Sequence, residues 1–343
     1  MSRPDPIIIS AVIITYKRLG HLKECLESIY AHTPHVKCQD LTPDPTPQND
    51  EWEMVVIVNG DDHASHTYLE QASLLNPNLR LIPIERMSNG GARNEALKHT
   101  SGEIIYFLDD DIIVDRDIIG ICREKFGRYV DTDIIGGPNL TPPAGNLLQK
   151  CSGHLLVSPF GSANVRRRYV SSGGDRPADD KSLILCNLAI RRKLFVNEKV
   201  VFDEKLVCNE ENLLMVTLAS RGYAMLHTPD LVVYHRRRAT LTGFAKQFFK
   251  YGCGRGQMTR RVPRSFSPYF ILPSLFIVYL ISLIFSRSQI YLFPLFSYFV
   301  LNVFFSFLTA VQYRDIRIFP CLFLLFPVGH VSYGLGFLRG LVK

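Results

Sequence analysis

The N-terminal half of the chain alternates short apolar runs with amphipathic segments, and this alternation limits the possible folds more than any other feature. The first run, Ile7–Thr15, is mostly β-branched, which is typical of a strand buried on both faces. Segment 19–29 then has apolar residues three and four positions apart, as in a helix that packs onto that strand. We expect further strands at 54–58, 79–84 and 103–108, helices near 64–75 and 91–99, and a proline-rich surface loop at 34–50. This order predicts a mostly parallel α/β sheet with helices on both faces.

Polar clusters follow these strands at the points where each strand ends. In parallel α/β sheets, ligands bind beyond the carboxyl ends of the strands, so the clusters are expected to meet at one edge. They are Thr15-Tyr16-Lys17-Arg18, Asn59-Gly60-Asp61-Asp62, Asn89-Gly90-Gly91 and Asp109-Asp110-Asp111. Each cluster taken singly is typical of an ordinary turn or helix start. Their convergence favours a binding site.

The acidic triplet Asp109-Asp110-Asp111 is the most chemically specific of these clusters. Alternate side chains of a strand share a face, so Asp109 and Asp111 are expected to point together and Asp110 away from them. Two carboxylates facing one cavity suit Mg²⁺ or Mn²⁺, with phosphate oxygens and water as the remaining ligands. The alternative is an acidic turn that only solvates the strand end, and the triplet alone does not decide between the two.

The C-terminal part of the chain is basic and then apolar. Residues 236–264 contain nine Lys and Arg and no acid, and apolar runs follow at 268–286, 289–311 and 318–337. Each run approaches the roughly 20 residues that cross a hydrocarbon core, although the third contains Pro327 and also suits a packed or re-entrant helix. Positive residues favour the cytoplasmic side of a membrane. We therefore predict a cytoplasmic domain at 1–235, a basic amphipathic juxtamembrane segment at 236–267 and two to three transmembrane helices within 268–343.

Several other classes of protein are disfavoured. The eight cysteines are scattered without metal-type spacing, as expected for reduced thiols. The chain has neither a P-loop motif nor Gly-x-Gly-x-x-Gly after the first strand, and its N-terminus does not resemble a secretory signal. Aromatic residues recur at helical spacing within the basic segment, which favours anionic lipid or a pyrophosphate over nucleic acid as its partner.

The order of these motifs resembles the family 2 glycosyltransferases of GT-A fold. The resemblance rests on Thr15-Tyr16, Asp61, Gly91-Ala92-Arg93-Asn94, the acidic triplet, Phe202–Leu206, Asn209–Leu213 and Val233-Tyr234-His235. Segments 248–255 and 333–340 are similar to a membrane-attached subgroup that builds bacterial exopolysaccharide of the succinoglycan type. One departure concerns Glu210-Glu211, because the family usually has Glu-Asp there.

The resemblance implies inverting transfer of a sugar from a nucleotide-diphosphate donor to a hydroxyl, with a divalent cation, Mn²⁺ or Mg²⁺. It implies that Glu211 is the catalytic base, with Glu210 as the next candidate. It also implies that Arg236 and Arg238 contact an acceptor or pyrophosphate. The metal ligands would be Asp109, Asp111 and His235. The donor would contact Thr15, Tyr16, Arg18, Asp61, Asn89, Gly91, Arg93, Asp109 and Asp110.

The implied partners are a nucleotide-sugar donor, a lipid-linked or other saccharide acceptor, membrane lipids and other polysaccharide-assembly proteins, but no nucleic acid. The implied location is the bacterial inner membrane, with the catalytic domain facing the cytoplasm. A non-catalytic nucleotide-binding scaffold subunit is an alternative, for which the Glu210-Glu211 departure leaves room. A metal-dependent phosphohydrolase is a weaker one, because the clusters of a two-metal site are missing.

Overall fold

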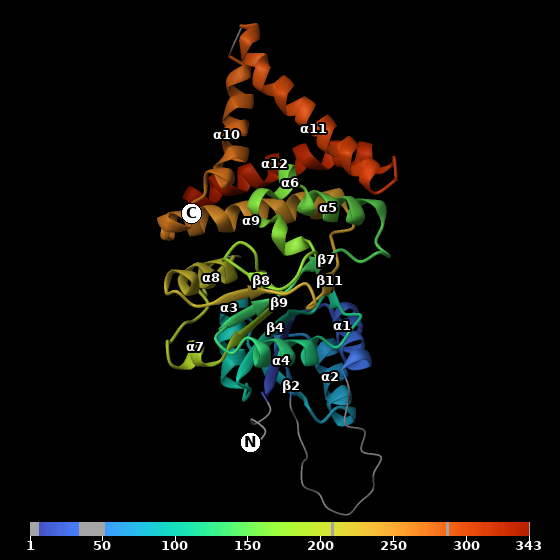
Figure 1. The fold of residues 1–343 in the computed structure, drawn as a ribbon, viewed down its shortest axis with the longest axis vertical. Coiled ribbons are helices and arrows are strands. Elements are labelled where there is room, and N and C mark those ends of the chain that lie inside the picture. The colour runs from blue at the N-terminus through green and yellow to red at the C-terminus, as the bar shows by residue number, and fades with distance from the viewer. Residues whose placement is uncertain (1–6, 34–51, 207–208, 286–287, 343) are drawn as a thin grey trace, which may run out of the picture. The chain divides into compact units, whose positions relative to one another are not determined.

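The computed structural model describes residues 7–33, 52–206, 209–285 and 288–342 (Figure 1). The chain divides into two compact units. The first, which we call the sheet unit, comprises Met1–Leu140, Ser171–Lys205 and Leu214–His235. The second, the helical unit, comprises Thr141–Val170, Leu206–Leu213 and Arg236–Lys343. The predicted loop at 34–50 lies outside the described residues, and the domain limits drawn from the sequence stay a prediction.

Within its described residues, the sheet unit contains an eight-stranded sheet of order β3-β2-β1-β4-β9-β6-β10-β8 and a three-stranded sheet of order β5-β11-β7. The strands of the large sheet are β1 (Ile9–Thr15), β2 (Trp52–Asn59), β3 (Leu79–Ile84), β4 (Ile104–Asp109), β6 (Ile134–Gly136), β8 (Arg176–Pro177), β9 (Asn187–Arg191) and β10 (Met225–His227). The small sheet is formed by β5 (Ile112–Ile113), β7 (Asn139–Leu140) and β11 (Val233–His235). Strands β1 to β4 run parallel, whereas β9 runs antiparallel to both β4 and β6. The predicted mostly parallel sheet is confirmed.

The register of the sheet aligns the carboxyl ends of its central strands. Thr15 of β1 pairs with Val58 of β2, and Ile14 pairs with Asp109 of β4. The polar clusters that follow these strands therefore begin at the same edge of the sheet, as the sequence predicts.

The sheet separates two buried apolar layers, because successive strand residues point to opposite faces. In β1, Ile9, Ala11 and Ile13 belong to one layer and Val12 to the other. The first layer is covered by α1 (Leu19–His32), α2 (His63–Leu75) and α4 (Ile118–Arg128). The second is covered by α3 (Asn89–Lys98), α7 (Lys193–Val196) and the later turns of α8 (Glu210–Ser220). Helices on both faces of the sheet are thus confirmed (Figure 1).

One buried histidine of this sheet is expected to make the stability of the protein depend on pH. His227 of β10 is fully buried, and burial together with nearby Arg176 lowers its pKa from 6.5 to about 4. The unfolded chain therefore binds more protons than the folded chain between these two pH values, and stability is lost as the pH falls through them. We expect the free energy of unfolding to drop by up to about 3 kcal/mol between pH 7 and pH 4 from this group.

The comparison that checks this expectation is the slope of unfolding free energy against pH in the wild type and in His227→Gln. The variant changes overall stability as well, so the slope and not the absolute value is the readout. A shallower slope in His227→Gln is expected, and equal slopes would show that His227 is not the group responsible.

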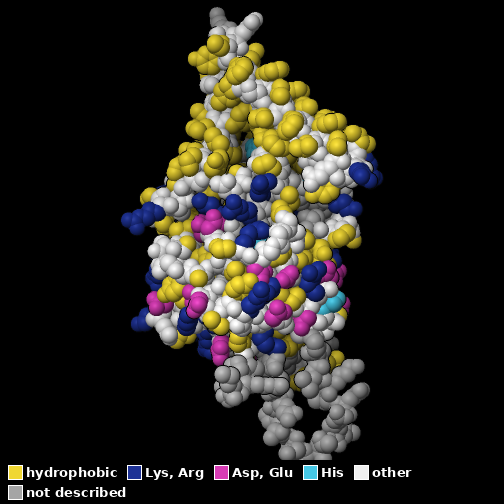
Figure 2. Space-filling model, in the orientation of Figure 1, with side chains coloured by type: hydrophobic (Ala, Val, Ile, Leu, Met, Phe, Trp, Pro, Cys, Tyr) yellow, Lys and Arg dark blue, Asp and Glu magenta, His cyan; other side chains and the backbone are white. Residues whose placement is uncertain are grey.

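Within its described residues, the helical unit is built mainly from helices, which come from separate stretches of the chain. Its elements are α5 (Leu147–Val157), α6 (Pro159–Ser162), η1 (Ala163–Tyr169), α9 (Leu241–Arg261), η2 (Pro263–Ser265), α10 (Pro268–Leu283), η3 (Gln289–Leu292), α11 (Phe293–Gln312) and α12 (Ile318–Val342). Segments Gln289–Gln312 and Ile318–Val342 are long and apolar enough to cross a membrane, whereas Pro268–Leu283 is shorter. Large apolar side chains are exposed along α10 and α11, and Figure 2 shows them gathered over this part of the molecule.

Helix α12 runs without interruption through Pro327. A proline inside a helix leaves the carbonyl four residues earlier without its backbone donor, which here is the carbonyl of Phe323. The side-chain amide of Asn302, on α11, donates a hydrogen bond to that carbonyl at 3.0 Å. The neighbouring helix thus replaces the hydrogen bond that Pro327 removes.

Helices α9 and α12 pack side by side through glycines (Figure 1). A Cβ atom at Gly252 of α9 would overlap the backbone oxygen of Tyr333, and one at Gly336 of α12 would overlap that of Phe249. Gly256 and Gly340 meet backbone atoms of the opposite helix in the same way. Each helix therefore carries two glycines four residues apart, the spacing that lets helix backbones approach closely. We call this contact the glycine seam.

Substitution within the glycine seam is expected to destabilise the helical unit. Gly340→Val would press a side chain against the backbone of Cys253, which cannot rotate away, and such overpacking costs about 1–3 kcal/mol or more. Thermal unfolding of the detergent-held protein measures the effect. Gly127→Val on α4 is the control, because nothing lies within 4 Å of a Cβ there. Equal melting temperatures for the two variants would contradict the close packing.

Candidate active site

The acidic triplet lies at the junction of two sheets. Strand β4 ends at Asp109, and Asp110 and Asp111 form a turn that leads directly into β5. From the sequence, the position of Asp111 was explained by the alternation of side chains along a strand. That explanation is wrong, because the strand has already ended at Asp109. The turn instead brings a carboxylate oxygen of Asp111 and one of Asp109 into the same group, within 4.8 Å.

His235 completes this group because of a short strand pairing. It is the last residue of β11, which pairs antiparallel with β5 so that His235 lies opposite Ile112, the residue after Asp111. The Nε2 atom of His235 is 2.8 Å from Oδ1 of Asp111 and 3.8 Å from Oδ2 of Asp109. Asp109, Asp111 and His235 each offer one ligand atom to this cluster.

The middle aspartate is held by residues that follow β1. The Thr15 hydroxyl donates a hydrogen bond to Asp110 at 2.9 Å, and Thr15 is itself buried. The Nη1 atom of Arg18 lies 3.0 Å from a carboxylate oxygen of Asp110 and 3.0 Å from one of Asp111. Thr15 and Arg18 therefore fix the acidic turn, and Asp110 points toward β1 instead of into the Asp109–Asp111–His235 group.

Burial and mutual repulsion raise the pKa values of these carboxyl groups. Burial, and then the neighbouring Asp111, raise the pKa of Asp109, while His235 and Arg93 oppose the shift. Burial raises the pKa of Asp110 to about 6, although Arg18 beside it acts in the opposite direction. The cluster thus concentrates negative charge that nearby cations only partly balance, which favours the binding of a further cation.

The loop after β2 reaches the loop after β1 through an exposed contact. Nζ of Lys17 is 3.4 Å from Oδ2 of Asp61, and the Tyr16 hydroxyl donates to Asp61 at the same distance. The guanidinium of Arg86 covers the Tyr16 ring at 4.0 Å from its centroid. Gly60 lies against Arg86 and Tyr16 and has a φ of +107°. A side chain at this position would strain the backbone and crowd Arg86. Tyr16, Asp61 and Arg86 form an open rim on this edge of the sheet.

The start of α3 lies beyond β3. Ser88 caps the helix by accepting a hydrogen bond from the backbone N–H of Gly91, and Asn89 is exposed in its first turn. Nη2 of Arg93 lies 3.9 Å from Oδ1 of Asp109, which links this helix to the acidic cluster. A Cβ atom at Gly90 would lie 2.8 Å from the backbone oxygen of Asp203. A side chain at position 90 would therefore crowd the backbone of the Asp203 segment.

The predicted base candidates lie at the first turn of α8 and belong to the helical unit. Glu210 is buried, and Glu211 is partly exposed and accepts a hydrogen bond from the Asn212 amide at 3.0 Å. Asn212 also donates to Asn209 and accepts from the buried Arg168. Two carboxylates at a helix N-terminus favour the helix dipole, and this network fixes their backbone.

The three arginines after β11 differ in their surroundings. Arg237 is buried, donates to the Thr141 hydroxyl at 3.1 Å and lies over the Tyr169 ring. Arg238 is exposed, and Arg236 is partly exposed. The two arginines that the sequence assigns to an acceptor or pyrophosphate therefore flank one that packs within the helical unit.

Asn187 is a positioning residue that the sequence analysis missed. Its fully buried side chain accepts from the Tyr106 hydroxyl at 2.6 Å and donates to the backbone oxygens of Pro138 and Leu231. These contacts tie β4 and β9 to the segments that lead into β7 and β11. A single asparagine in a β9 run offers no signal in the sequence, because its partners are distant along the chain.

The ligand atoms available in this site fit a divalent cation of the Mg²⁺ or Mn²⁺ type. Two carboxylates and one imidazole converge, and oxygen-rich sets with imidazole suit Mn²⁺ while leaving positions for water and phosphate oxygens. The roles of the individual residues stay predictions.

Solved structures with a similar fold include the mannosyltransferase PcManGT from Pyrobaculum calidifontis in complex with GDP-Man and Mn²⁺. It has 17% identity and a TM-score of 0.58, and the match covers 93% of this chain and 88% of that one. The S. aureus TarS 1–349 structure in complex with UDP-GlcNAc has 14% identity and a TM-score of 0.48, over 76% of this chain and 72% of that one. At such identities the likeness to PcManGT bears on the fold alone.

No curated protein matches the chain by sequence. The family described as "Glycosyl transferase family 2" does match, over residues 10–194. This range includes β1 from its second residue, all of β2 to β4 and the acidic triplet, and it spans more than half of the chain. With the GT-A arrangement of its sheet and this family match, the chain belongs to glycosyl transferase family 2.

Proposed function

We propose that this glycosyltransferase moves a sugar from a nucleotide-diphosphate donor to a hydroxyl of a lipid-linked saccharide at a membrane. The observation that carries the donor side of this proposal is the convergence of Asp109, Asp111 and His235 at the carboxyl edge of the sheet. Family membership carries the reaction class. The apolar helices of the second unit support the membrane acceptor.

On the donor side, Asp109, Asp111 and His235 would hold the cation, and Arg93 would add positive charge from α3. A cation held there would neutralise charge on the departing diphosphate, and the similar PcManGT structure contains both GDP-Man and Mn²⁺. Thr15 and Arg18 would act mainly by fixing Asp110 and Asp111, as their hydrogen bonds indicate. Tyr16 and Asp61 would contact the nucleoside at the open rim, with Asn89 and Gly91 beside them at the start of α3.

On the acceptor side, a carboxylate must take the proton of the attacking hydroxyl. The acceptor oxygen forms a bond to the anomeric carbon while the bond from that carbon to the diphosphate oxygen breaks, which inverts the configuration. We assign the proton to Glu211, with Glu210 as the competing candidate. Glu211 is the more exposed of the two, and Asn212 orients its carboxylate. Arg236 and Arg238 would contact the pyrophosphate of the acceptor.

The acceptor is tested directly with lipid-linked saccharides. The purified protein would be incubated with a radiolabelled nucleotide sugar and polyprenyl-diphosphate-linked saccharides, and label would be counted after organic extraction. Cation-dependent label in the lipid fraction is the expected result. Label found only on water-soluble saccharides would overturn the lipid-linked acceptor, and it would also argue against the resemblance to the succinoglycan-type enzymes.

For the membrane arrangement, we propose that α10 and α11 enter the bilayer while α12 lies along its surface beside α9. Helix α9 carries Lys246, Lys250, Arg260 and other cations, so it cannot lie in hydrocarbon at acceptable cost. The glycine seam keeps α12 against α9. The exposed apolar side chains are instead concentrated on α10 and α11.

This arrangement predicts that the C-terminus lies on the same side of the membrane as the sheet unit. A green fluorescent protein fused after the C-terminus is expected to fluoresce in a bacterial host, and an alkaline phosphatase fusion is expected to be inactive. An active phosphatase fusion would show that α12 crosses the membrane. The positive residues Arg339 and Lys343 agree with the predicted side.

A further inference from the structure

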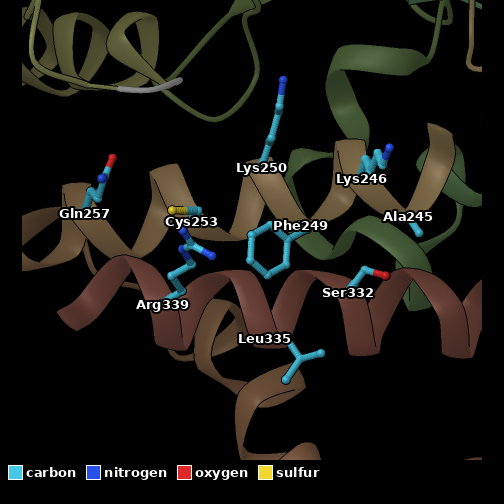
Figure 3. A pocket seen from close by; sticks show the side chains of 9 residues that line it. All are labelled: Ala245, Lys246, Phe249, Lys250, Cys253, Gln257, Ser332, Leu335 and Arg339. Atoms are coloured by element: carbon cyan, nitrogen blue, oxygen red, sulfur yellow. The ribbon is translucent and has the colours of Figure 1, made fainter. Parts of the chain in front are cut away.

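A groove of about 510 Å³ lies along α9 and α12 in the helical unit (Figure 3). Most of its lining is carbon, and Phe249 and Leu335 contribute large apolar side chains. Leu335 is 46% exposed although it is apolar, so it offers a surface that water solvates poorly. An apolar ligand chain would gain by covering it.

The same groove carries positive charge. Among the described residues that line it, Lys246, Lys250 and Arg339 are cations and none is acidic. Figure 3 shows Lys246 and Lys250 extending from α9 away from α12, whereas Leu335 extends from the opposite side of α12. The groove thus has a cationic side and an apolar side, which is the arrangement that an anionic amphiphile fits.

The side-chain amide of Gln257 is a second feature of the groove that points to a ligand. Gln257 lines the groove and is 7% exposed, and within the described part of the chain its buried Oε1 atom accepts no hydrogen bond. A buried amide oxygen without a donor costs stability, so a ligand that supplies a hydroxyl would be favoured there.

We propose that this groove binds an anionic phospholipid whose headgroup carries a hydroxyl. The phosphate lies at Lys250 and Arg339, the headgroup hydroxyl donates to Gln257, and the upper part of an acyl chain covers Phe249 and Leu335. The proposal goes beyond the transfer reaction and rests only on the proposed placement of the helical unit at a membrane. Such a lipid fastens the paired helices α9 and α12 to the bilayer surface.

The lining favours a phospholipid over the saccharide-bearing acceptor. Recognition of a sugar needs several directed hydrogen-bonding groups, because each hydroxyl buried without a partner is costly. The uncharged polar side chains of this groove are those of Gln257 and Ser332. These are enough for a small headgroup and too few to select a saccharide.

The test is native mass spectrometry of the detergent-purified full chain, exposed in turn to phosphatidylglycerol, phosphatidylcholine and a polyprenyl diphosphate. We expect one tightly retained phosphatidylglycerol and no retained phosphatidylcholine. The double variant Lys250→Gln with Arg339→Gln is expected to lose retention about 30-fold, since each cation contributes roughly fivefold to lipid binding near a surface. Arg264→Gln with Arg314→Gln is the matched control, because it removes two exposed cations outside the groove.

A second variant keeps the test independent of charge. Ser332→Trp would fill the groove without altering any cation, and it is also expected to abolish retention. Equal retention by the groove variant and the control variant would overturn the proposal in favour of diffuse surface attraction. Retention of polyprenyl diphosphate but not of phosphatidylglycerol would assign the groove to the acceptor lipid instead. Neither result depends on sugar transfer, so failure here leaves the proposed reaction untouched.

Discussion

Asp111→Asn is expected to lower the rate of sugar transfer about 1,000-fold or more while leaving the protein folded. The substitution keeps the size of the side chain but removes the charge that would bind the cation beside Asp109 and His235. Cation stabilisation of a departing diphosphate contributes several kcal/mol, and each 1.36 kcal/mol corresponds to a tenfold change in rate. The measurement is the initial rate of nucleoside diphosphate release at saturating donor, together with Mn²⁺ binding by calorimetry.

Asp131→Asn serves as the control for Asp111→Asn. Asp131 is exposed in the same unit, and the substitution removes the same charge. It is expected to alter neither the rate nor Mn²⁺ binding. Full activity in Asp111→Asn would rule out the assigned metal site. Lost activity with Mn²⁺ binding unchanged would mean that Asp111 acts through its ion pair with Arg18 instead.

Glu211→Gln is expected to reduce turnover by roughly 10²–10⁴-fold, the contribution of a positioned general base. The amide cannot accept the proton of the acceptor hydroxyl, but it can still interact with Asn212, so the start of α8 should keep its structure. Donor binding should be unchanged, because the base acts on the acceptor. Turnover and the dissociation constant of the nucleotide sugar would be measured on the same preparation.

Glu210→Gln is the matched control for the assignment of the base. Glu210 is buried in the first turn of α8, and we expect its substitution to affect stability more than turnover. A large loss of turnover in Glu210→Gln, with Glu211→Gln fully active, would move the role of base to Glu210. Full turnover in both variants would show that the base lies elsewhere in the chain.

The fold was largely predictable, because long helices and strands leave a regular spacing of apolar residues in the sequence. Strands β1, β2 and β4 each follow the pattern of a doubly buried strand, and α1 repeats its apolar residues at helical spacing. The edge where the polar clusters meet follows from parallel strand order alone. The apolar run 318–337 also predicted most of α12, although its composition left open whether this helix spans a membrane or packs within the protein.

The details of the site depend on short elements and distant partners that leave no periodic signal. Strands β5 and β11 have two and three residues, yet their pairing brings His235 to Asp111. The sequence named both residues but gave alternation along a strand as the reason for the position of Asp111. Asn187 had no signal at all. The glycine seam could have been suspected from the spacing of Gly252 and Gly256 and of Gly336 and Gly340.

The central claim is cation-dependent use of a nucleotide sugar at the Asp109–Asp111–His235 group. It is tested most directly by measuring nucleoside diphosphate release from a panel of nucleotide sugars, with Mn²⁺, Mg²⁺ or a chelator, by the purified protein and by Asp111→Asn. We predict release from one donor, abolished by the chelator and in the variant. Release that persists in both would contradict the metal site. Cation-dependent donor binding without any release, even when lipid-linked saccharides are supplied, would contradict catalysis and favour a nucleotide-binding scaffold.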